Sequence, residues 1–203
     1  MKGIVLTDDA GKQELLQKGI YGLDLVFAYS MEEILEGKAD TYFILSDNLS
    51  VDELLRIPVK PIFFNSVIKT LNQLNLPQNY CRINGWPTFI NRKTWEVAGD
   101  EKIVSQTFDC FGLEYSIVPD TPGFISPRIV AMIINEAFFT LGEGISTAGE
   151  IDIAMKLGTN YPYGPFEWAK KIGLTKITEL LNELAKEDNI YTPASSLLAS
   201  LNS

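Results

Sequence analysis

The sequence contains no histidine among its 203 residues. Histidine is the side chain whose ordinary pKa lies nearest to neutrality, so its absence excludes Ser-His-Asp and Cys-His triads, histidine zinc ligands and a histidine general base. Any chemistry must therefore use carboxylates, amines, phenols, hydroxyls or thiols, and we expect no metal site.

Cysteine and basic residues are also scarce. Cys81 and Cys110 are too far apart in the sequence for a Cys-x-x-Cys motif, and we expect both to be buried thiols of a reducing compartment. With 17 basic and 26 acidic residues the net charge is −9, which disfavours nucleic acid and anionic membranes as partners. No apolar run reaches the ~20 residues that span a bilayer, and the N-terminal residues resemble no signal peptide, so we expect a cytoplasmic protein.

The first part of the chain alternates short apolar runs with charged helical patterns. The apolar runs predict strands at 3–7, 23–29, 42–45, 61–64 and 114–118, and the helical patterns cover 12–18, 31–36, 51–55 and 101–111. This alternation is typical of βαβ units. We therefore expect an α/β fold with a mainly parallel sheet covered by helices.

The hydrophobic period changes after the segment 119–123. Apolar residues then recur at helical spacing, first over 127–141 with an unusually wide apolar face, and Thr147 with Glu150 forms a capping box for the next helix. Three more helical patterns follow, and Ser126 with Pro127 fits the N-cap and first position of the long helix. The sequence therefore predicts a domain at 1–118 and an all-α domain at 119–203.

The helical half carries a series of motifs in a fixed order. They are Asp120-Thr121-Pro122-Gly123-Phe124-Ile125, Asn135-Glu136-Ala137, the segment 150–158 and the segment 161–167. This series resembles the C-terminal domain of the 3-hydroxyacyl-CoA dehydrogenase family. The resemblance implies a reduced Rossmann-like N-terminal domain, an all-α C-terminal dimerisation domain, a homodimer, and a place in fatty-acid and acyl-CoA metabolism with NAD as cofactor.

The residues that would bind NAD depart from this family. Its members carry Gly-x-Gly-x-x-Gly after the first strand, whereas this chain has Thr7-Asp8-Asp9-Ala10-Gly11-Lys12, in which two carboxylates would repel a pyrophosphate. The second strand also lacks a terminal acidic residue for the NAD ribose, because Glu32 and Glu33 fit the first turn of a helix. We therefore expect no NAD cofactor, and we assign no cofactor-binding residue.

The catalytic positions of the family are altered as well. Trp95-Glu96-Val97 matches the segment with the family's catalytic glutamate, and counting back by the family spacing places Asn84 where the catalytic histidine belongs. An alternative alignment through Phe89-Ile90-Asn91 places Thr88 there, and neither residue can act as a general base. Pro127 stands where the family has a catalytic asparagine.

Three candidate site residues remain, and three functions stay open. Glu96 is a candidate catalytic remnant, and Asn65 with Ser66 resembles the family's turn near the substrate hydroxyl. The first hypothesis is a family member without NAD-dependent activity that binds an acyl-CoA or pairs with a pathway enzyme. The second is an active oxidoreductase that uses Glu96, a tyrosine or a lysine as base. The third is a dimeric interaction module without a small-molecule site.

Overall fold

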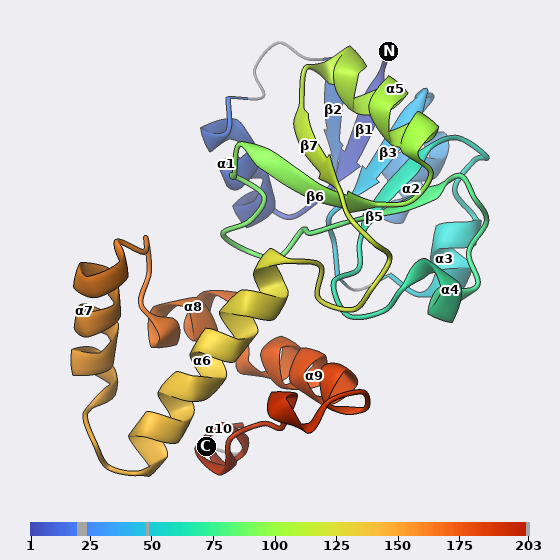
Figure 1. The fold of residues 1–203 in the computed structure, drawn as a ribbon. Coiled ribbons are helices and arrows are strands. Elements are labelled where there is room, and N and C mark those ends of the chain that lie inside the picture. Colours follow the sequence, from blue (N-terminus) through green and yellow to red (C-terminus); the bar gives the residue numbers. More distant parts are fainter. Residues whose placement is uncertain (20–23, 48, 202–203) are drawn as a thin grey trace. The chain divides into compact units, whose positions relative to one another are not determined.

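The computed structural model describes residues 1–19, 24–47 and 49–201. The chain divides into two compact units, Met1–Phe124 and Ile125–Ser203 (Figure 1). All strands of the described residues lie in the first unit, which confirms the predicted α/β fold followed by helices. Residues 119–124, which the sequence pattern assigns to the helical half, pack with the first unit, where the Gly123 amide donates to the Val67 carbonyl at 2.8 Å.

One seven-stranded sheet forms the centre of the first unit, with the strand order β2-β1-β3-β4-β5-β6-β7. The strands are β1 (Gly3–Leu6), β2 (Leu25–Ala28), β3 (Thr41–Ile44), β4 (Ile62–Asn65), β5 (Tyr80–Ile83), β6 (Thr94–Ala98) and β7 (Glu114–Ile117). Strands β1 to β5 are parallel, β6 pairs antiparallel with β5, and β7 pairs parallel with β6. The sheet is thus mainly parallel, as predicted.

Two of these strands are absent from the sequence prediction. The five predicted strands are all found with small changes at their ends, except that Leu23 lies outside the described residues. Strand β5 was missed because its sequence, Tyr-Cys-Arg-Ile, has a charged residue at its centre. A charge normally marks a solvent-facing position, but Arg82 is fully buried.

Helices cover both faces of the sheet. Successive side chains of each strand point to opposite faces, and because the buried strands are apolar on both faces, both must be covered. Helices α1 (Asp9–Gln17) and α5 (Glu101–Phe111) pack on the face with Phe43 and Phe63. Helices α2 (Met31–Glu36) and α3 (Val51–Leu55) pack on the opposite face, together with the short α4 (Leu71–Leu74). The core therefore has the three layers of a Rossmann-like domain.

The two cysteines occupy different environments. Cys81 is completely buried in β5, and burial raises the pKa of its thiol to about 12. Cys110 is exposed on α5, so the prediction that both thiols are buried is wrong for this residue. It lies on the outer side of the helix, whereas Phe108 and Phe111 lie on the side that packs against the sheet.

The second unit is entirely helical over its described residues. Its elements are α6 (Ser126–Gly142), α7 (Ala148–Thr159), α8 (Pro165–Ile172), α9 (Leu174–Ala185), a short 3₁₀ helix η1 (Asn189–Tyr191) and α10 (Ser195–Ser200). The capping box of Thr147 and Glu150 is confirmed. Ser126 is not the N-cap of α6, because the helix begins one residue earlier than predicted and Ile125 takes that position.

Motif residues of the helical half hold its helices together. The Asn135 side chain of α6 donates to the Thr192 carbonyl at 2.9 Å and accepts from the Ala194 amide at 2.8 Å. The buried Asp152 carboxylate of α7 accepts from the Phe166 amide of α8 at 2.8 Å. Within the described residues no helix combines the length and the hydrophobicity needed to cross a membrane.

Candidate functional site

The candidate site lies where the parallel strands β1, β3, β4 and β5 end. Thr7, Asp47 and Asn84 follow the first, second and fourth of these strands, and Asn65 is the last residue of the third. The chain leaves β1 for β2 on one side and returns to β3 on the other, so a topological switch point lies between β1 and β3. Ligands of open α/β sheets bind outside the carboxyl ends of the strands at such a point.

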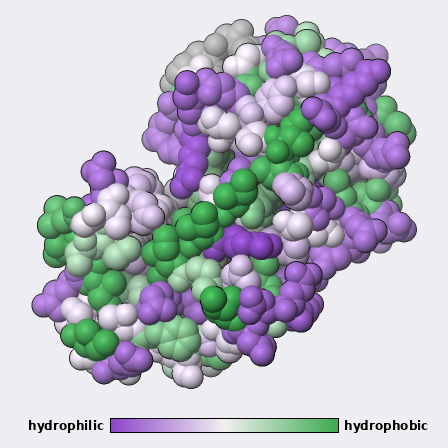
Figure 2. Space-filling view, viewed as in Figure 1, coloured by the Kyte–Doolittle hydropathy of each residue, from purple (hydrophilic) through white to green (hydrophobic). Residues whose placement is uncertain are grey.

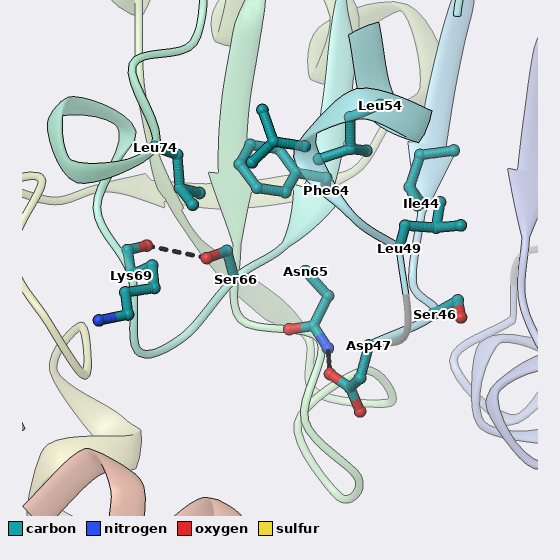
Figure 3. Close-up of a pocket in the computed structure, with 11 residues that line it drawn as sticks. Ile44, Ser46, Asp47, Leu49, Leu54, Phe64, Asn65, Ser66, Lys69 and Leu74 are labelled. Atoms are coloured by element: carbon teal, nitrogen blue, oxygen red, sulfur yellow. Dashed lines mark hydrogen bonds between the residues drawn. The ribbon is translucent and has the colours of Figure 1, made fainter. Parts of the chain in front are cut away.

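A hydrogen-bonded network joins three of these strand ends. The Asn65 side chain donates to the Asp47 carboxylate (Figure 3). The side-chain oxygen of Asn65 accepts from the Gly85 amide at 2.9 Å. A Cβ atom at Gly85 would lie 2.7 Å from Cγ of Asn65, so only glycine allows this approach. Both polar groups of the Asn65 amide are therefore used to hold the ends of β3, β4 and β5 together.

A pocket of about 180 Å³ opens beside this network. Its lining is apolar over one part, contributed by Ile44, Leu49, Val51, Leu54, Phe64 and Leu74. Polar residues line the remainder, and Figure 3 shows Asn65 and Asp47 there, joined by their hydrogen bond. Ser66 also lines the pocket, and its hydroxyl donates to the Lys69 carbonyl at 2.8 Å. The pocket offers a short apolar chain a binding surface with polar groups at one side.

Asn84 and Glu96 form a pair at the next strand end. The side-chain nitrogen of Asn84 donates to Oε2 of Glu96 at 3.2 Å. The backbone N–H of Asn84 donates to the backbone carbonyl of Glu96, also at 3.2 Å. Asn84 is 6% exposed, and its Oδ1 is buried without a hydrogen-bond partner among the described residues. Glu96 is half-buried on β6. The two residues are thus positioned by adjacent antiparallel strands.

Thr88 lies in the loop between β5 and β6 and contacts a different carboxylate. Its amide donates to both carboxylate oxygens of Glu14 on α1, at 3.0 Å each. Its φ angle is +74°, which is unfavourable for a β-branched residue, and its buried hydroxyl has no partner among the described residues. Glu14 therefore contributes to holding Thr88 in a strained conformation at the sheet edge.

Arg82 fixes the backbone that carries the candidate substrate residue Ser66. Its guanidinium donates to the carbonyl oxygens of Ser66 at 2.8 Å and Val67 at 3.2 Å, and it forms an ion pair with Asp120. The second oxygen of Asp120 accepts from the Leu71 amide at 2.9 Å. Burial lowers the pKa of Arg82, while the hydrogen bond and charge of Asp120 act in the opposite direction.

Comparison with known proteins identifies the helical unit and finds a likeness over most of the chain. The family model "3-hydroxyacyl-CoA dehydrogenase, C-terminal domain" matches residues 123–202. A 3-hydroxybutyryl-CoA dehydrogenase of Clostridioides difficile is 30% identical over 188 residues, which are 88% of this chain and 65% of that protein, so the likeness extends into the first unit. Residues 123–202 thus belong to the C-terminal domain of the 3-hydroxyacyl-CoA dehydrogenase family.

Two further relatives differ in how much of this chain they match. The 3-hydroxyadipyl-CoA dehydrogenase of Escherichia coli is 44% identical over 82 residues, which are 39% of this chain and 17% of that enzyme. The solved structure of (S)-3-hydroxybutyryl-CoA dehydrogenase from Ralstonia eutropha has the same fold, with a TM-score of 0.74 at 20% identity over 98% of this chain and 92% of that one. The match spans less than two thirds of both the E. coli and the C. difficile proteins.

The NAD-binding turn of the 3-hydroxyacyl-CoA dehydrogenase family does not fit this chain. The Asp8 carboxylate caps α1 and accepts from the Gly11 amide at 2.8 Å, which is the kind of donor that a pyrophosphate would need. A Cβ atom at Gly11 would lie 2.2 Å from Oγ1 of Thr7, so the turn closes tightly on itself. At the end of β2, the Glu33 carboxylate is already bound to the Tyr29 amide at 2.9 Å. These residues do not form a dinucleotide site of the family's type.

The geometry distinguishes the two alignments for the family's catalytic histidine. Asn84 hydrogen-bonds to Glu96, whereas the amide of Thr88 is bound to Glu14. Glu96 is therefore placed beside Asn84, as the first alignment expects. Pro127 lies in the first turn of α6, where its missing N–H costs nothing.

Several residues of this site carry no motif that the sequence analysis used. Asp47, Glu14 and Arg82 were all missed. Asp47 closely follows the buried strand β3, and Asn65 ends the buried strand β4. Their common place at the carboxyl ends of parallel strands is the signal from which Asp47 could have been predicted as a site residue. Glu14 and Arg82 give no such signal in the sequence. Charged residues in helices and strands are mostly exposed, so a sequence-based prediction places both on the surface. Two of the predicted residues, Asn65 and Glu96, are connected through the neighbouring residues Asn84 and Gly85. Asn65 accepts from the Gly85 amide, and Glu96 accepts from the Asn84 side chain.

Proposed function

We propose that this chain binds an acyl-CoA of the 3-hydroxyacyl type without oxidising it through NAD. The observation that carries the proposal is the hydrogen bond between the side-chain amide of Asn84 and Glu96. This amide stands where the family's catalytic histidine is expected. An amide neither takes nor gives a proton near neutral pH, so it cannot serve as the general base that removes the hydroxyl proton. The self-capped turn at Asp8 supports the same proposal from the cofactor side.

The ligand class follows from the family and the pocket. The relatives in C. difficile and R. eutropha are named for 3-hydroxybutyryl-CoA, a short acyl ester. The pocket of about 180 Å³ is smaller than the roughly 300–1,000 Å³ typical of drug-sized ligands. We therefore place a short acyl chain, rather than a long one, against Phe64 and Leu54.

Turnover is the direct test of the catalytic part of this proposal. Purified protein is mixed with acetoacetyl-CoA and NADH, and NADH absorbance is followed over time. Since a general base contributes roughly 10²- to 10⁴-fold to a rate, we expect no turnover above the background of protein-free buffer. A rate above about one per second would overturn the proposal. Glu96 would then be the first candidate base to replace, before any tyrosine or lysine.

We also propose that the chain pairs with a second copy of itself through the helical unit. Apolar side chains are exposed on α6 and α7, with Ile129 53%, Phe139 42%, Ile153 56% and Leu157 83% exposed. Figure 2 shows hydrophobic atoms running along α6. A monomer rarely keeps so much apolar surface in water, and a two-fold interface would cover it.

A further inference from the structure

A second pocket, of about 340 Å³, has a lysine in its wall and plays no part in the proposed function. The described residues that line it are Lys18, Gly19, Lys93, Phe111, Gly112, Leu113 and Glu114. Phe111 and Leu113 are buried, Lys18 is half-buried, and Lys93 and Glu114 are exposed. Lys18, the C-cap of α1, therefore lies between apolar side chains and the surface.

Two backbone carbonyls of the β5–β6 connection hold the Lys18 amine in place. Its Nζ donates to the carbonyl oxygens of Arg92 and of Lys93, the latter at 2.7 Å. The same nitrogen lies 5.3 Å from the ring centre of the buried Trp95. A neutral amine has two N–H donors and one lone pair, so these carbonyls can use both donors and leave the lone pair available. The amine is thus fixed in position without losing its nucleophilic electron pair.

The charged groups around this pocket treat its two lysines differently. Partial burial lowers the pKa of Lys18 to about 8, against the weaker opposing charge of Glu114 on β7. The hydrogen bond of Lys93 to Glu114, at 2.8 Å, raises the pKa of Lys93. The Arg92 guanidinium lies over the Phe89 ring, 4.1 Å from its centre. Near pH 8 about half of the Lys18 amines are therefore neutral, while Lys93 stays charged.

We propose that Lys18 is a nucleophilic amine that accepts an acyl group from a small acyl thioester whose acyl end enters this pocket. The Nζ lone pair attacks the thioester carbonyl carbon, a C–N bond forms, and the C–S bond breaks with its electron pair passing to sulfur. The nitrogen loses one proton to water and the released thiolate can take one up, so the products are an amide and a free thiol.

The chemistry of the leaving group favours a thioester over an oxygen ester. A thiol has an ordinary pKa of about 8.5, so its thiolate departs without a general acid, whereas an alkoxide needs one. The carboxylate of Glu114 is held by Lys93 and is not needed as an acid for this step. A lysine desolvated beside apolar side chains is a known type of activated nucleophile.

Acetylation by acetyl-CoA, followed lysine by lysine on the full chain, tests the proposal. Wild-type protein is incubated with acetyl-CoA at pH 8 and digested with a protease that does not cut at lysine. Mass spectrometry then gives the acetylated fraction of each lysine over time. Lys93 is the internal control, because it lines the same pocket but stays charged. Lys102, an exposed lysine on α5, reports the background.

We expect Lys18 to be acetylated about 10-fold faster than Lys93 or Lys102. Each unit by which a pKa is lowered raises the neutral fraction about 10-fold, and part of this gain is lost because nucleophilicity falls with pKa, as thiols show. The rate at Lys18 should rise up to about pH 8 and level off above it. In urea, where the folded pocket is lost, the three lysines should react at equal rates.

The variant Lys18→Arg should remove the fast phase of acetylation from the intact mass, and Lys102→Arg should keep it. Equal rates at the three lysines of the folded protein overturn the proposal, as does an advantage of Lys18 that persists in urea. A Lys18 rate that continues to rise toward pH 10 overturns it as well. Fast acetylation that is confined to folded Lys18 and levels off near pH 8 supports it. The proposed function is tested separately, because it concerns a different pocket.

Discussion

At the scale of single residues, Asn84 is the substitution that most changes the chemistry expected of the fold. It keeps a contact with Glu96 while removing the capacity to transfer a proton. The cofactor site is altered independently, because Asp8 occupies the N-terminus of α1. Under the proposed function, these two changes separately oppose NAD-linked oxidation.

The first prediction is that Asn84→His does not restore activity. A histidine beside Glu96 could act as a base, but hydride transfer also requires a nicotinamide held next to the hydroxyl carbon, and the α1 turn does not fit the pyrophosphate. We expect the variant to turn over acetoacetyl-CoA with NADH below about one per second, as measured by NADH absorbance. A faster rate would show that the phosphates are held elsewhere.

A second prediction concerns Lys18, whose pKa is lowered to about 8 because the side chain is half-buried, with Glu114 acting weakly in the opposite direction. Between pH 8 and the ordinary value of 10.5, the unfolded chain binds more protons than the folded one. The contribution of Lys18 to the free energy of unfolding therefore rises with pH across this window. Below pH 8 the burial of the charge is fully unfavourable.

Urea unfolding of wild-type protein and Lys18→Met at about pH 7 and about pH 9.5 isolates this effect, since other titrations cancel in the difference. We expect the stability of wild-type relative to the variant to increase at the higher pH. Lys102→Met, at an exposed lysine on α5, is the control and should show no such change. Parallel pH curves for wild-type and Lys18→Met would contradict the assignment.

At the scale of elements, the fully buried Arg82 of β5 forms an ion pair with the half-buried Asp120, which lies in the segment that follows β7. Arg82 is fully buried, and Asp120 also accepts from the Leu71 amide at the start of α4. We predict that Asp120→Ala lowers the free energy of unfolding by about 3 kcal/mol, because it leaves a buried charge without its partner. Chemical denaturation measures this. Lys93→Ala breaks the exposed pair with Glu114 and should have little measurable effect. Equal effects of the two variants would contradict the prediction.

The sequence predicts the helices and strands well where the hydrophobic pattern matches the burial of the side chains in the structure. The helices at 31–36, 51–55 and 101–111 and the Thr147 capping box follow directly from cap residues and apolar spacing. The strand β5 could not be predicted, because its central Arg82 is satisfied only by carbonyls and a carboxylate that are distant in the sequence. The pairing of Asn84 with Glu96 could be predicted only from the family spacing. That Oδ1 of Asn84 has no hydrogen-bond partner within residues 1–19, 24–47 and 49–201 is seen only in the structure.

At the scale of the whole molecule, the exposed apolar side chains of the helical unit predict a homodimer. Light scattering coupled to size exclusion should give twice the 22.6 kDa mass of the chain at micromolar concentration. Leu157→Lys, at an 83% exposed position, should shift the protein toward the monomer without unfolding it, because the side chain makes little contact within its own chain. A wild-type monomer would contradict this prediction.

The central claim is that this chain binds acyl-CoA esters without NAD, and a single titration series on one protein preparation tests it most directly. Isothermal calorimetry with (S)-3-hydroxybutyryl-CoA and, separately, with NAD and NADH compares the two ligand classes under identical conditions. We predict measurable heat and a saturable isotherm for the ester. We predict no saturable binding for either nucleotide, because the Asp8 carboxylate lies at the N-terminus of α1 and already accepts from the Gly11 amide, a donor of the kind that a pyrophosphate requires. Binding of NADH with micromolar affinity, or absence of binding by the ester, would contradict the account.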